Sequence, residues 1–579
     1  MSDALHRREF IARGLAVAGA AAGLGADIAP ALAAASADAD AGSVYVNGTI
    51  LTMEGDAPAT VEAVAVRDGR IAFAGSRDGA RAAVPQARVV DLQGRTMLPG
   101  FIDTWGHFML FAQQTLGVNL AYFSDDPPHS KAGIIRLLRG TAPFNGWITG
   151  YGYSETLLSD GAPTLADLDA AFPDTPVLIG TLSTLTGKIN SAGMARLGLT
   201  PATPAAQPGM IVKDPATGRL TGDLLFTPYL VARAAAVGSY SEAQAFQTFR
   251  AAEALLARQG WTTVQSYQLV PQEMASLRAA FDAGVISLDV MGLPAVSDAA
   301  SGRMVEQTDW HWGTYSHGDH GLKVAGYQVV TDAAPQLRLA AFTQPYADTT
   351  GFPDGWKGSL LPRDMVEHWV SYAYANGIQL FAYSNGDAGI DLSLSAIEKA
   401  ISETGKTGDR RTVIAHSYFV RPDQLERYRQ MQLGASMMPP HLAVYGDQQL
   451  GILGPARANM EAPMASAMAA GVRLTLHCDY PSASPNVMDT IGIAVTRTTL
   501  TGRVMGPQEH LSPYAALQGM TSKAAYNYRE ETLKGTITAG KIADLVILDG
   551  NPLAVAPEAI KDIKVMETIK RGRTIYRQG

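Results

Sequence analysis

The chain has 579 residues, of which 47% are hydrophobic and 17% are charged. A chain of this length can bury the core of a large catalytic domain and that of a smaller one. The formal net charge of −8, without a long basic run, argues against nucleic acid as a partner. The single cysteine, Cys478, excludes an intramolecular disulfide framework and a cysteine-rich zinc site.

Residues 1–37 resemble a twin-arginine signal peptide. Arg7 and Arg8 precede a weakly hydrophobic run of alanine and glycine, and small residues that suit cleavage follow between Ala33 and Ala37. The run is too short and too rich in glycine for a convincing membrane span. We therefore expect the twin-arginine export machinery as a partner and a periplasmic or secreted mature protein, unless the segment stays uncleaved as an anchor.

Two distant segments, 43–98 and 530–579, share short stretches of alternating apolar and polar residues, which is typical of strands. The Asp68–Gly69 pair predicts a hairpin between two of these stretches. Because the two ends of the chain have the same character, we expect them to pair into one small composite β-sandwich. Residues 99–529 are then inserted between its halves.

Residues 99–529 alternate buried strands with amphipathic helical runs, a pattern that indicates βα units and a parallel sheet. The predicted fold class is therefore α/β, a TIM (β/α)8 barrel, whose chemistry lies at the C-terminal ends of its strands. A stretch at about 110–240 is interpreted as an insertion beside the barrel mouth. The eight predicted strands are 100–105, 261–267, 287–292, 322–327, 378–384, 412–417, 434–439 and 473–479.

Several motifs resemble the amidohydrolase superfamily, in particular its N-substituted formamide deformylase-like branch (amidohydrolase family 3). They are "LPGFID" at 98–103, "HCDYP" at 477–481 and "GTITAGKIADLVILDGNPL" at 535–553. Weaker marks of the branch are "NSAGMARLGLTP" at 190–201 and "SNGDAGIDLSLSAIEKA" at 384–400. The resemblance covers nearly the whole chain after the signal segment. It implies hydrolysis of non-peptide C–N bonds by activated water, with one or two divalent metal ions at the strand ends.

Two of the metal ligands that the resemblance implies have been replaced. Trp105 occupies the first position of the His-x-His motif after strand one, and Tyr383 occupies the histidine position after strand five. Indole has no lone pair available for a metal, and a phenol is a rare zinc ligand. A binuclear centre is therefore not expected.

Four positions keep the residue types that the resemblance implies. His107 is the second histidine of the His-x-His motif, Lys323 stands at the bridging-lysine position, His416 follows strand six and Asp479 follows strand eight. On one interpretation, His107, His416 and Asp479 hold a single divalent ion, most naturally zinc, with water in the fourth position and Lys323 as an alternative ligand.

On a second interpretation there is no metal, and the same residues form an acid–base pocket. Asp479 is then the general base, His416 or His107 carries protons, Tyr383 donates a hydrogen bond to a developing oxyanion and Lys323 adds a further acid–base group. Such a pocket suits a lyase, an isomerase or a decarboxylase. A non-catalytic binding protein is the third interpretation.

Aromatic residues and methionine gather at the predicted strand ends, and this suits a flat or apolar small-molecule substrate. The function that we expect is an exported hydrolase of a small organic molecule, and the sequence is compatible with a homo-oligomer. The predicted substrate-binding residues are Trp105, Tyr267, Tyr327, Tyr480, His441 and Met438.

Overall fold

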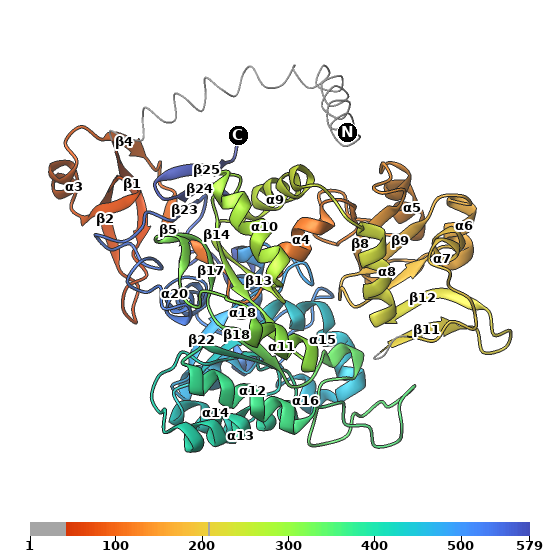
Figure 1. The fold of residues 1–579 in the computed structure, drawn as a ribbon. Coiled ribbons are helices and arrows are strands. Elements are labelled where there is room, and N and C mark those ends of the chain that lie inside the picture. Colours follow the sequence, from red (N-terminus) through yellow and green to blue (C-terminus); the bar gives the residue numbers. More distant parts are fainter. Residues whose placement is uncertain (1–41, 206–208) are drawn as a thin grey trace, which may run out of the picture.

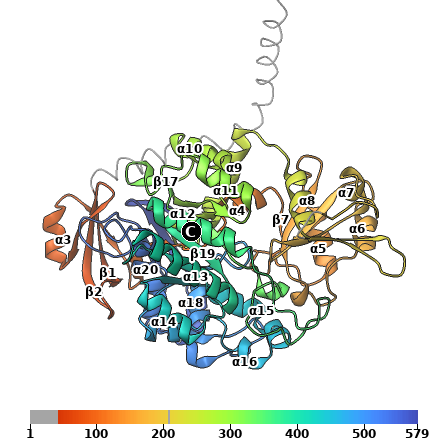
Figure 2. The same cartoon turned by 60° about the horizontal axis from the view of Figure 1, so that its bottom comes forward.

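The structure, a computed structural model, describes residues 42–205 and 209–579. The signal segment expected at 1–37 lies outside the described residues. Figure 1 shows a sheet from both chain ends in red and blue, a central body in green to cyan and an inserted segment in orange to yellow. The end sheet and the insertion lie on opposite sides of the central body, as Figure 2 also shows. Within the described ranges, no helix is long and apolar enough to cross a membrane.

The two ends of the chain meet in one eight-stranded sheet. The antiparallel pairing of β5 with β23 joins them, with Met97 opposite Ile547. Apolar residues from both ends, Tyr45, Val64 and Leu545 among them, pack into one cluster. The elements are β1 (Ser43–Leu51), β2 (Thr60–Arg67), β3 (Arg70–Gly75), α3 (Arg77–Ala83), β4 (Arg88–Asp91), β5 (Thr96–Pro99), β23 (Leu545–Leu548), η4 (Pro557–Asp562), β24 (Val565–Lys570) and β25 (Arg573–Arg577).

The central body contains a strand at each of the eight places where the sequence predicts one. These strands form two parallel arrays, β6-β13-β14-β17 and β15-β18-β19-β20-β21-β22, and β16 adds an antiparallel edge. No backbone ladder joins β22 to β6 in the described part of the chain, although the Thr104 hydroxyl donates to the Leu476 carbonyl across that gap at 3.0 Å. The strands are β6 (Phe101–Ile102), β13 (Trp261–Tyr267), β14 (Asp289–Leu293), β15 (Ala295–Val296), β16 (Tyr315–His317), β17 (His320–Val324), β18 (Tyr327–Val330), β19 (Leu380–Ser384), β20 (Val413–His416), β21 (Gly434–Met437) and β22 (Arg473–Leu476).

Helices follow most of these strands and cover the outside of the central body (Figure 1). Local chemistry sets their ends: Ser241 caps α9 with its side chain, and Gly377 ends α12 with a φ of 71°. The elements are α4 (Phe108–Gln114), α9 (Glu242–Ala257), α10 (Pro271–Asp282), α11 (Ala299–Gln307), η2 (Pro335–Leu337), α12 (Arg363–Asn376), α13 (Asp387–Thr404), α14 (Pro422–Gln430), α15 (Pro439–Leu453), α16 (Pro455–Ala458), α17 (Met464–Ala469), α18 (Val487–Thr496), η3 (Pro507–Glu509), α19 (Pro513–Gly519) and α20 (Ser522–Asn527).

The fourth strand is interrupted and therefore longer than the sequence suggests. It runs as β17 to Val324, breaks at Gly326 and resumes as β18, which is paired with β19. A Cβ atom at Gly326 would lie 2.1 Å from the carbonyl oxygen of Gln379, so only glycine fits where the two backbones approach. The C-terminal end of the fourth strand is therefore at 330, seven residues beyond Lys323.

The inserted segment forms its own sheet, in the order β11-β12-β10-β9-β8-β7. Two apolar clusters, one around Ile148 and Val177 and the other around Trp147 and Tyr229, give it a core separate from that of the central body. The elements are β7 (Val118–Asn119), α5 (Lys131–Arg139), β8 (Ile148–Tyr153), η1 (Glu155–Leu157), α6 (Leu165–Ala171), β9 (Val177–Thr181), β10 (Thr186–Ile189), α7 (Ser191–Arg196), β11 (Gly209–Lys213), β12 (Leu220–Phe226) and α8 (Thr227–Val237).

A buried network of charges joins the C-terminal segment to the N-terminal ends of the central strands. Asp289, at the start of β14, accepts hydrogen bonds from the ammonium groups of Lys534 and Lys570, the latter at 2.7 Å. Lys534 also lies 3.5 Å from the carboxylate of Glu530, which in turn pairs with Lys323. Burial by itself would raise the pKa of Asp289, but the two ammonium groups lower it by more than burial raises it. The pKa of Asp289 therefore lies below its ordinary value.

This network predicts a large loss of stability when its central carboxylate is removed. Asp289→Asn removes the carboxylate that the two buried ammonium groups share and leaves each with a single anion, Glu530 for Lys534 and Asp544 for Lys570. We expect the free energy of unfolding to fall by about 3–5 kcal/mol. Urea denaturation measures the change. Asp282→Asn is the matched control, because the Asp282 side chain is 72% exposed and, among the described residues, forms an ion pair only with His317. Equal losses in the two variants would contradict the prediction.

Candidate active site

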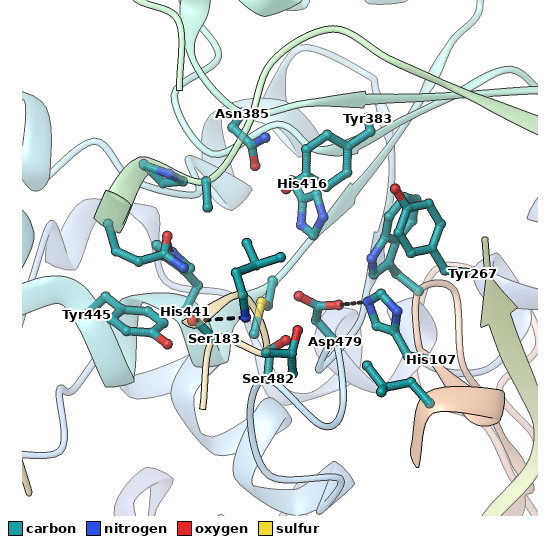
Figure 3. A pocket seen from close by; sticks show the side chains of 18 of the residues that line it. His107, Ser183, Tyr267, Tyr383, Asn385, His416, His441, Tyr445, Asp479 and Ser482 are labelled. Carbon is teal, nitrogen blue, oxygen red and sulfur yellow. Dashed lines mark hydrogen bonds and ion pairs between the residues drawn. The ribbon is translucent and has the colours of Figure 1, made fainter. Parts of the chain in front are cut away.

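A cavity of about 200 Å³ lies at the C-terminal ends of the central strands, with residues of the insertion completing its wall. Figure 3 shows the side chains around this space, with Asn385 and His416 on one side and the bonded pair Asp479 and His107 on another. The residues predicted from the sequence that line the cavity are Trp105, His107, Tyr267, Tyr383, His416, Met438, His441 and Asp479.

The loop after β6 is fixed by a buried carboxylate. Asp103 accepts hydrogen bonds from the backbone N–H groups of Trp105 and Gln265, at 3.0 and 3.3 Å. A Cβ atom at Gly106 would lie 2.1 Å from Asp103 Oδ2, so the loop can pass the carboxylate only with glycine at this position. Burial raises the pKa of Asp103 to about 7. The side chain of Trp105 is thereby held at the strand ends.

The indole ring of Trp105 fills the centre of an aromatic cluster. Its ring centroid lies 5.0 Å from that of Tyr267, 5.6 Å from that of Tyr383 and 4.9 Å from that of His416. Trp105 is 1% exposed, so the ring packs within the wall rather than across an open space. Trp105 stands where the resemblance implies a metal-ligating histidine. Its ring thus occupies the space between side chains that a metal centre would have to bring together.

His107 and Asp479 are bonded to each other. His107 Nε2 lies 3.0 Å from Asp479 Oδ1, and the backbone N–H of His107 donates to the carbonyl of Tyr480 at 3.1 Å. Asp479 Oδ2 has no hydrogen-bond partner among the residues that the structure describes, and Asp479 lines the cavity. The pair therefore offers one carboxylate oxygen to a molecule in the cavity.

A chain of buried hydrogen bonds leads to His416. The Thr104 hydroxyl donates to the Leu476 carbonyl at 3.0 Å, so its oxygen accepts from the Ser436 hydroxyl at 2.8 Å. The Ser436 oxygen in turn accepts from Nδ1–H of His477 at 2.9 Å. His477 Nε2, which then carries a lone pair, accepts from Nδ1–H of His416 at 3.2 Å.

This chain decides the tautomer of His416. With its proton on Nδ1, the ring carries a lone pair on Nε2, which is buried and has no hydrogen-bond partner in the described part of the chain. Burial lowers the pKa of His416 well below its ordinary value, and the rings of His477, His441 and His107 lower it further. His416 is therefore neutral at neutral pH and presents a proton acceptor at the cavity wall.

A second fixed acceptor comes from Asn385. Its side-chain N–H donates to Asp332 at 2.9 Å, and the same carboxylate accepts backbone N–H groups of Asn385, Gly386 and Ala341. Because the Asp332 carboxylate accepts the side-chain N–H of Asn385, the amide can take only one orientation, with Oδ1 directed away from Asp332. Asn385 Oδ1 is buried and has no hydrogen-bond partner among the described residues. Figure 3 shows this oxygen directed into the cavity.

His441 lines the cavity, but both of its ring nitrogens are engaged. Nδ1 lies 2.5 Å from a carboxylate oxygen of Glu461, and Nε2 lies 2.9 Å from the side-chain oxygen of Gln336. Its ring stacks on that of Tyr418, with the centroids 4.3 Å apart. His441 therefore contributes a ring face to the wall rather than a free nitrogen.

The backbone at the two central residues is unusual. His416 and Asp479 have φ values of 68° and 56°, in the left-handed region that non-glycine residues rarely adopt. His416 is the last residue of β20 and Asp479 lies three residues after the end of β22, so both left-handed turns lie at the C-terminal ends of central strands. Residues held in this way cluster at functional sites, because the surrounding structure must compensate for the strain.

Three residues predicted for the site lie elsewhere. Lys323 lies in β17, below the break in the fourth strand, and donates to the Tyr528 carbonyl at 2.9 Å within the buried charge network. Tyr327 begins β18 and faces outward, where its hydroxyl donates to the Trp369 carbonyl of α12. The ring of Tyr480 packs against Phe111 and Trp261, and Tyr480 is not among the residues that line the cavity.

Residues that the sequence analysis did not assign to the site also line it. Asn385, Gln336 and Tyr445 come from the segments after the central strands, and Ser183 and Arg233 come from the insertion. The signal for Arg233 was present, since it is the one charged residue of the apolar helix "TPYLVARAAAV". Nothing in the sequence placed that helix against the strand ends.

A model of the amidohydrolase family matches residues 88–576. The chain belongs to the amidohydrolase family. This confirms the resemblance inferred from the motifs, and it identifies the chain as a member of a hydrolase family.

Two amidohydrolase relatives match almost their whole length. The N-substituted formamide deformylase of Arthrobacter pascens is 24% identical over 549 residues, covering 92% of this chain and 98% of its own. The amidohydrolase YtcJ of Bacillus subtilis is 26% identical over 550 residues, covering 92% of this chain and 99% of its own.

Two solved structures share the fold. A metal-dependent hydrolase from Pyrococcus horikoshii superposes with a TM-score of 0.70 at 21% identity, covering 89% of this chain and 99% of its own. A second one, from Pyrococcus furiosus, has a TM-score of 0.69 at 21% identity, covering 88% of this chain and 100% of its own. The likeness supports a TIM-barrel-like α/β architecture for the central body.

The residues of this amidohydrolase do not fit the metal centre that the resemblance implies. Among the described residues, no group of three or more His, Cys, Asp or Glu side chains is placed to hold an ion, so His107, His416 and Asp479 do not form the predicted ligand set. His107 Nε2 is occupied by Asp479, and the ring of Trp105, which has no lone pair for a metal, packs against His416. The open acceptors at the cavity wall include His416 Nε2 and Asn385 Oδ1.

The hydrogen-bond chain predicts the protonation of His416 directly. At about pH 5.5, below the ordinary histidine pKa of about 6.5, we expect His416 to stay neutral with its proton on Nδ1. Long-range ¹H–¹⁵N correlation spectra of labelled protein distinguish this tautomer from the Nε2–H form and from the charged ring. The urea-unfolded chain supplies the reference spectrum. A protonated Nε2 in the folded protein at that pH would contradict the assignment.

Proposed function

We propose that this amidohydrolase hydrolyses a non-peptide C–N bond in a small aromatic or apolar molecule, with water activated by side chains rather than by a metal ion. The observation that carries the proposal is the lone pair of His416 Nε2, which is buried, fixed by the hydrogen-bond chain from Thr104 and directed at the cavity. A neutral imidazole at the site of reaction is the most common general base in enzymes.

The steps use only groups at the cavity wall. His416 Nε2 accepts one proton from water as the water oxygen bonds to the carbonyl carbon of the substrate. Asp479 Oδ2 accepts a hydrogen bond from the remaining O–H of that water, which stays with the acid product. When the C–N bond breaks, the proton on Nε2 passes to the departing nitrogen. Tyr383, which extends into the cavity beside His416 (Figure 3), is the donor for the oxyanion, and Asn385 Oδ1 accepts an N–H of the substrate.

The class of bond comes from the family and from one relative. The deformylase of Arthrobacter pascens is described as acting on N-substituted formamides, and a formamide has the carbonyl, the C–N bond and the small size that suit a cavity of about 200 Å³. The rings of Trp105 and Tyr267 supply a wall for a flat or apolar substituent. The signal-like segment at 1–37 supports the further proposal that the protein works outside the cytoplasm.

One observation also favours a second function. A neutral base that accepts from the cavity can remove a proton from carbon as well as from water, so the same site serves an elimination or an isomerisation. Solvent oxygen distinguishes the two functions. Hydrolysis in ¹⁸O-labelled water places the label in the acid product, whereas elimination and isomerisation leave it in the solvent.

The central variants are His416→Gln and Asp479→Asn, assayed on a panel of N-substituted formamides and other small aromatic amides. Each variant removes a group that handles the attacking water, so we expect kcat to fall by about 10²–10⁴-fold. His368→Gln, which changes an exposed histidine on α12, is the control and should keep full activity.

Chelation separates this proposal from metal catalysis. Activity after exhaustive dialysis against a chelator should equal that of the untreated enzyme, and added zinc should not raise it. Activity that is lost on chelation and recovered with zinc would overturn the metal-independent step, whereas full activity in both His416→Gln and Asp479→Asn would overturn the assignment of the site.

A further inference from the structure

We propose that the substrate carries a carboxylate group, and that Arg233 of the insertion is the residue that binds it. This inference rests on the proposed function, because it names the class of molecule that the same cavity takes. The observation behind it is a guanidinium group at the cavity wall that lacks the close hydrogen-bond or ion-pair partners found beside two fully buried cations of this protein.

Arg233 reaches the cavity from α8 of the insertion. Its Nη1 makes only a long hydrogen bond, 3.5 Å, to the carbonyl of Thr184, and its guanidinium carbon lies 6.0 Å from the ring centroid of Tyr229. Five N–H donors are available on a guanidinium, so most of its donors remain for a molecule in the cavity.

No carboxylate lies within 4.0 Å of the Arg233 guanidinium among the residues that the structure describes. Glu273 is the acidic group that interacts with Arg233 through space, and it accepts the Val270 N–H at 3.3 Å at the start of α10. Burial lowers the pKa of Arg233, although nearby Tyr229 and Glu273 oppose that effect. The cation is therefore partly desolvated without a bonded anion.

Two cations that are more deeply buried than Arg233 have close partners. Arg497, which is 0% exposed, donates to the carbonyl oxygens of Met505, Ala462 and Glu461 at 2.7, 2.9 and 2.7 Å. Lys570, which is 3% exposed, lies 2.7 Å from Asp289 and from Asp544. Since a charge removed from water is costly unless it is paired, the open fork of Arg233 is best explained by an anion that arrives with the ligand.

A carboxylate is the anion that matches the paired N–H donors of the Arg233 guanidinium. The planar guanidinium binds a carboxylate through two parallel N–H···O bonds, which adds direction as well as charge. Asp479 repels an anion, so the carboxylate must lie toward the insertion, and the amide group is left at His416 and Asn385. The chemical class is thus a small amide with a flat or apolar part and a carboxylate at the other end.

The test compares ligands that differ only in charge, with the full-length protein in a calorimeter. The probes are benzoate against benzamide and phenylacetate against phenylacetamide. We expect each acid to bind at least about tenfold more tightly than its amide, the gain expected of a charge-assisted bidentate contact. Arg233→Gln should remove the difference, and Arg233→Lys should retain part of it. Arg219→Gln, an exposed arginine of the same insertion, should leave the difference unchanged.

Several outcomes would overturn the inference. Equal binding of acid and amide in both pairs, which includes no detectable binding up to the solubility limit, is one of them, and a preference for acid that survives Arg233→Gln is another. His416→Gln should keep the full preference for acid, because it changes the base and not the anion site. If His416→Gln retained hydrolysis while Arg233→Gln lost the preference, the proposed catalytic step would fail and the carboxylate site would stand.

Discussion

The chemistry of the site depends on one chain of hydrogen bonds that begins at a backbone carbonyl. Because the Leu476 carbonyl can only accept, the hydroxyl of Thr104 must donate to it, and each following bond then has one possible direction up to His416. The lone pair of His416 at the cavity is thus set by backbone geometry three residues from Asp479. This chain carries Trp105 and Tyr383 at two positions where the resemblance implies histidine, and His416 still presents a defined proton acceptor.

The insertion and the central body contribute different groups to the cavity wall. The segments at the strand ends supply the lone pair of His416, the carboxylate of Asp479 and the acceptor of Asn385. The insertion, which has its own sheet and core, supplies Arg233 and the turn around Ser183. Function in such folds lies in groups brought to the C-terminal ends of the strands, so a change in the insertion alters what is bound without altering how it reacts.

Toward the N-terminal ends of the central strands, the buried charged groups are paired with one another. Lys323, Lys534 and Lys570 are closely paired with Asp289 and Glu530, toward the N-terminal ends of the strands and away from the cavity described above. Buried pairs of this kind hold the C-terminal segment in place, and removing one partner is costly. The contrast with Arg233 distinguishes a cation that serves the fold from one that serves a ligand.

The sequence by itself determined the strands, the family and the chemical types at the strand ends, because strand periodicity and side-chain identity are local properties. Trp105, His416 and Asp479 were placed correctly at the cavity for that reason. The tertiary structure alone decided the break at Gly326, which moves Lys323 away from the mouth, and the approach of Arg233 across the insertion. Both depend on contacts between segments far apart in the chain, and no local pattern specifies how such segments approach each other.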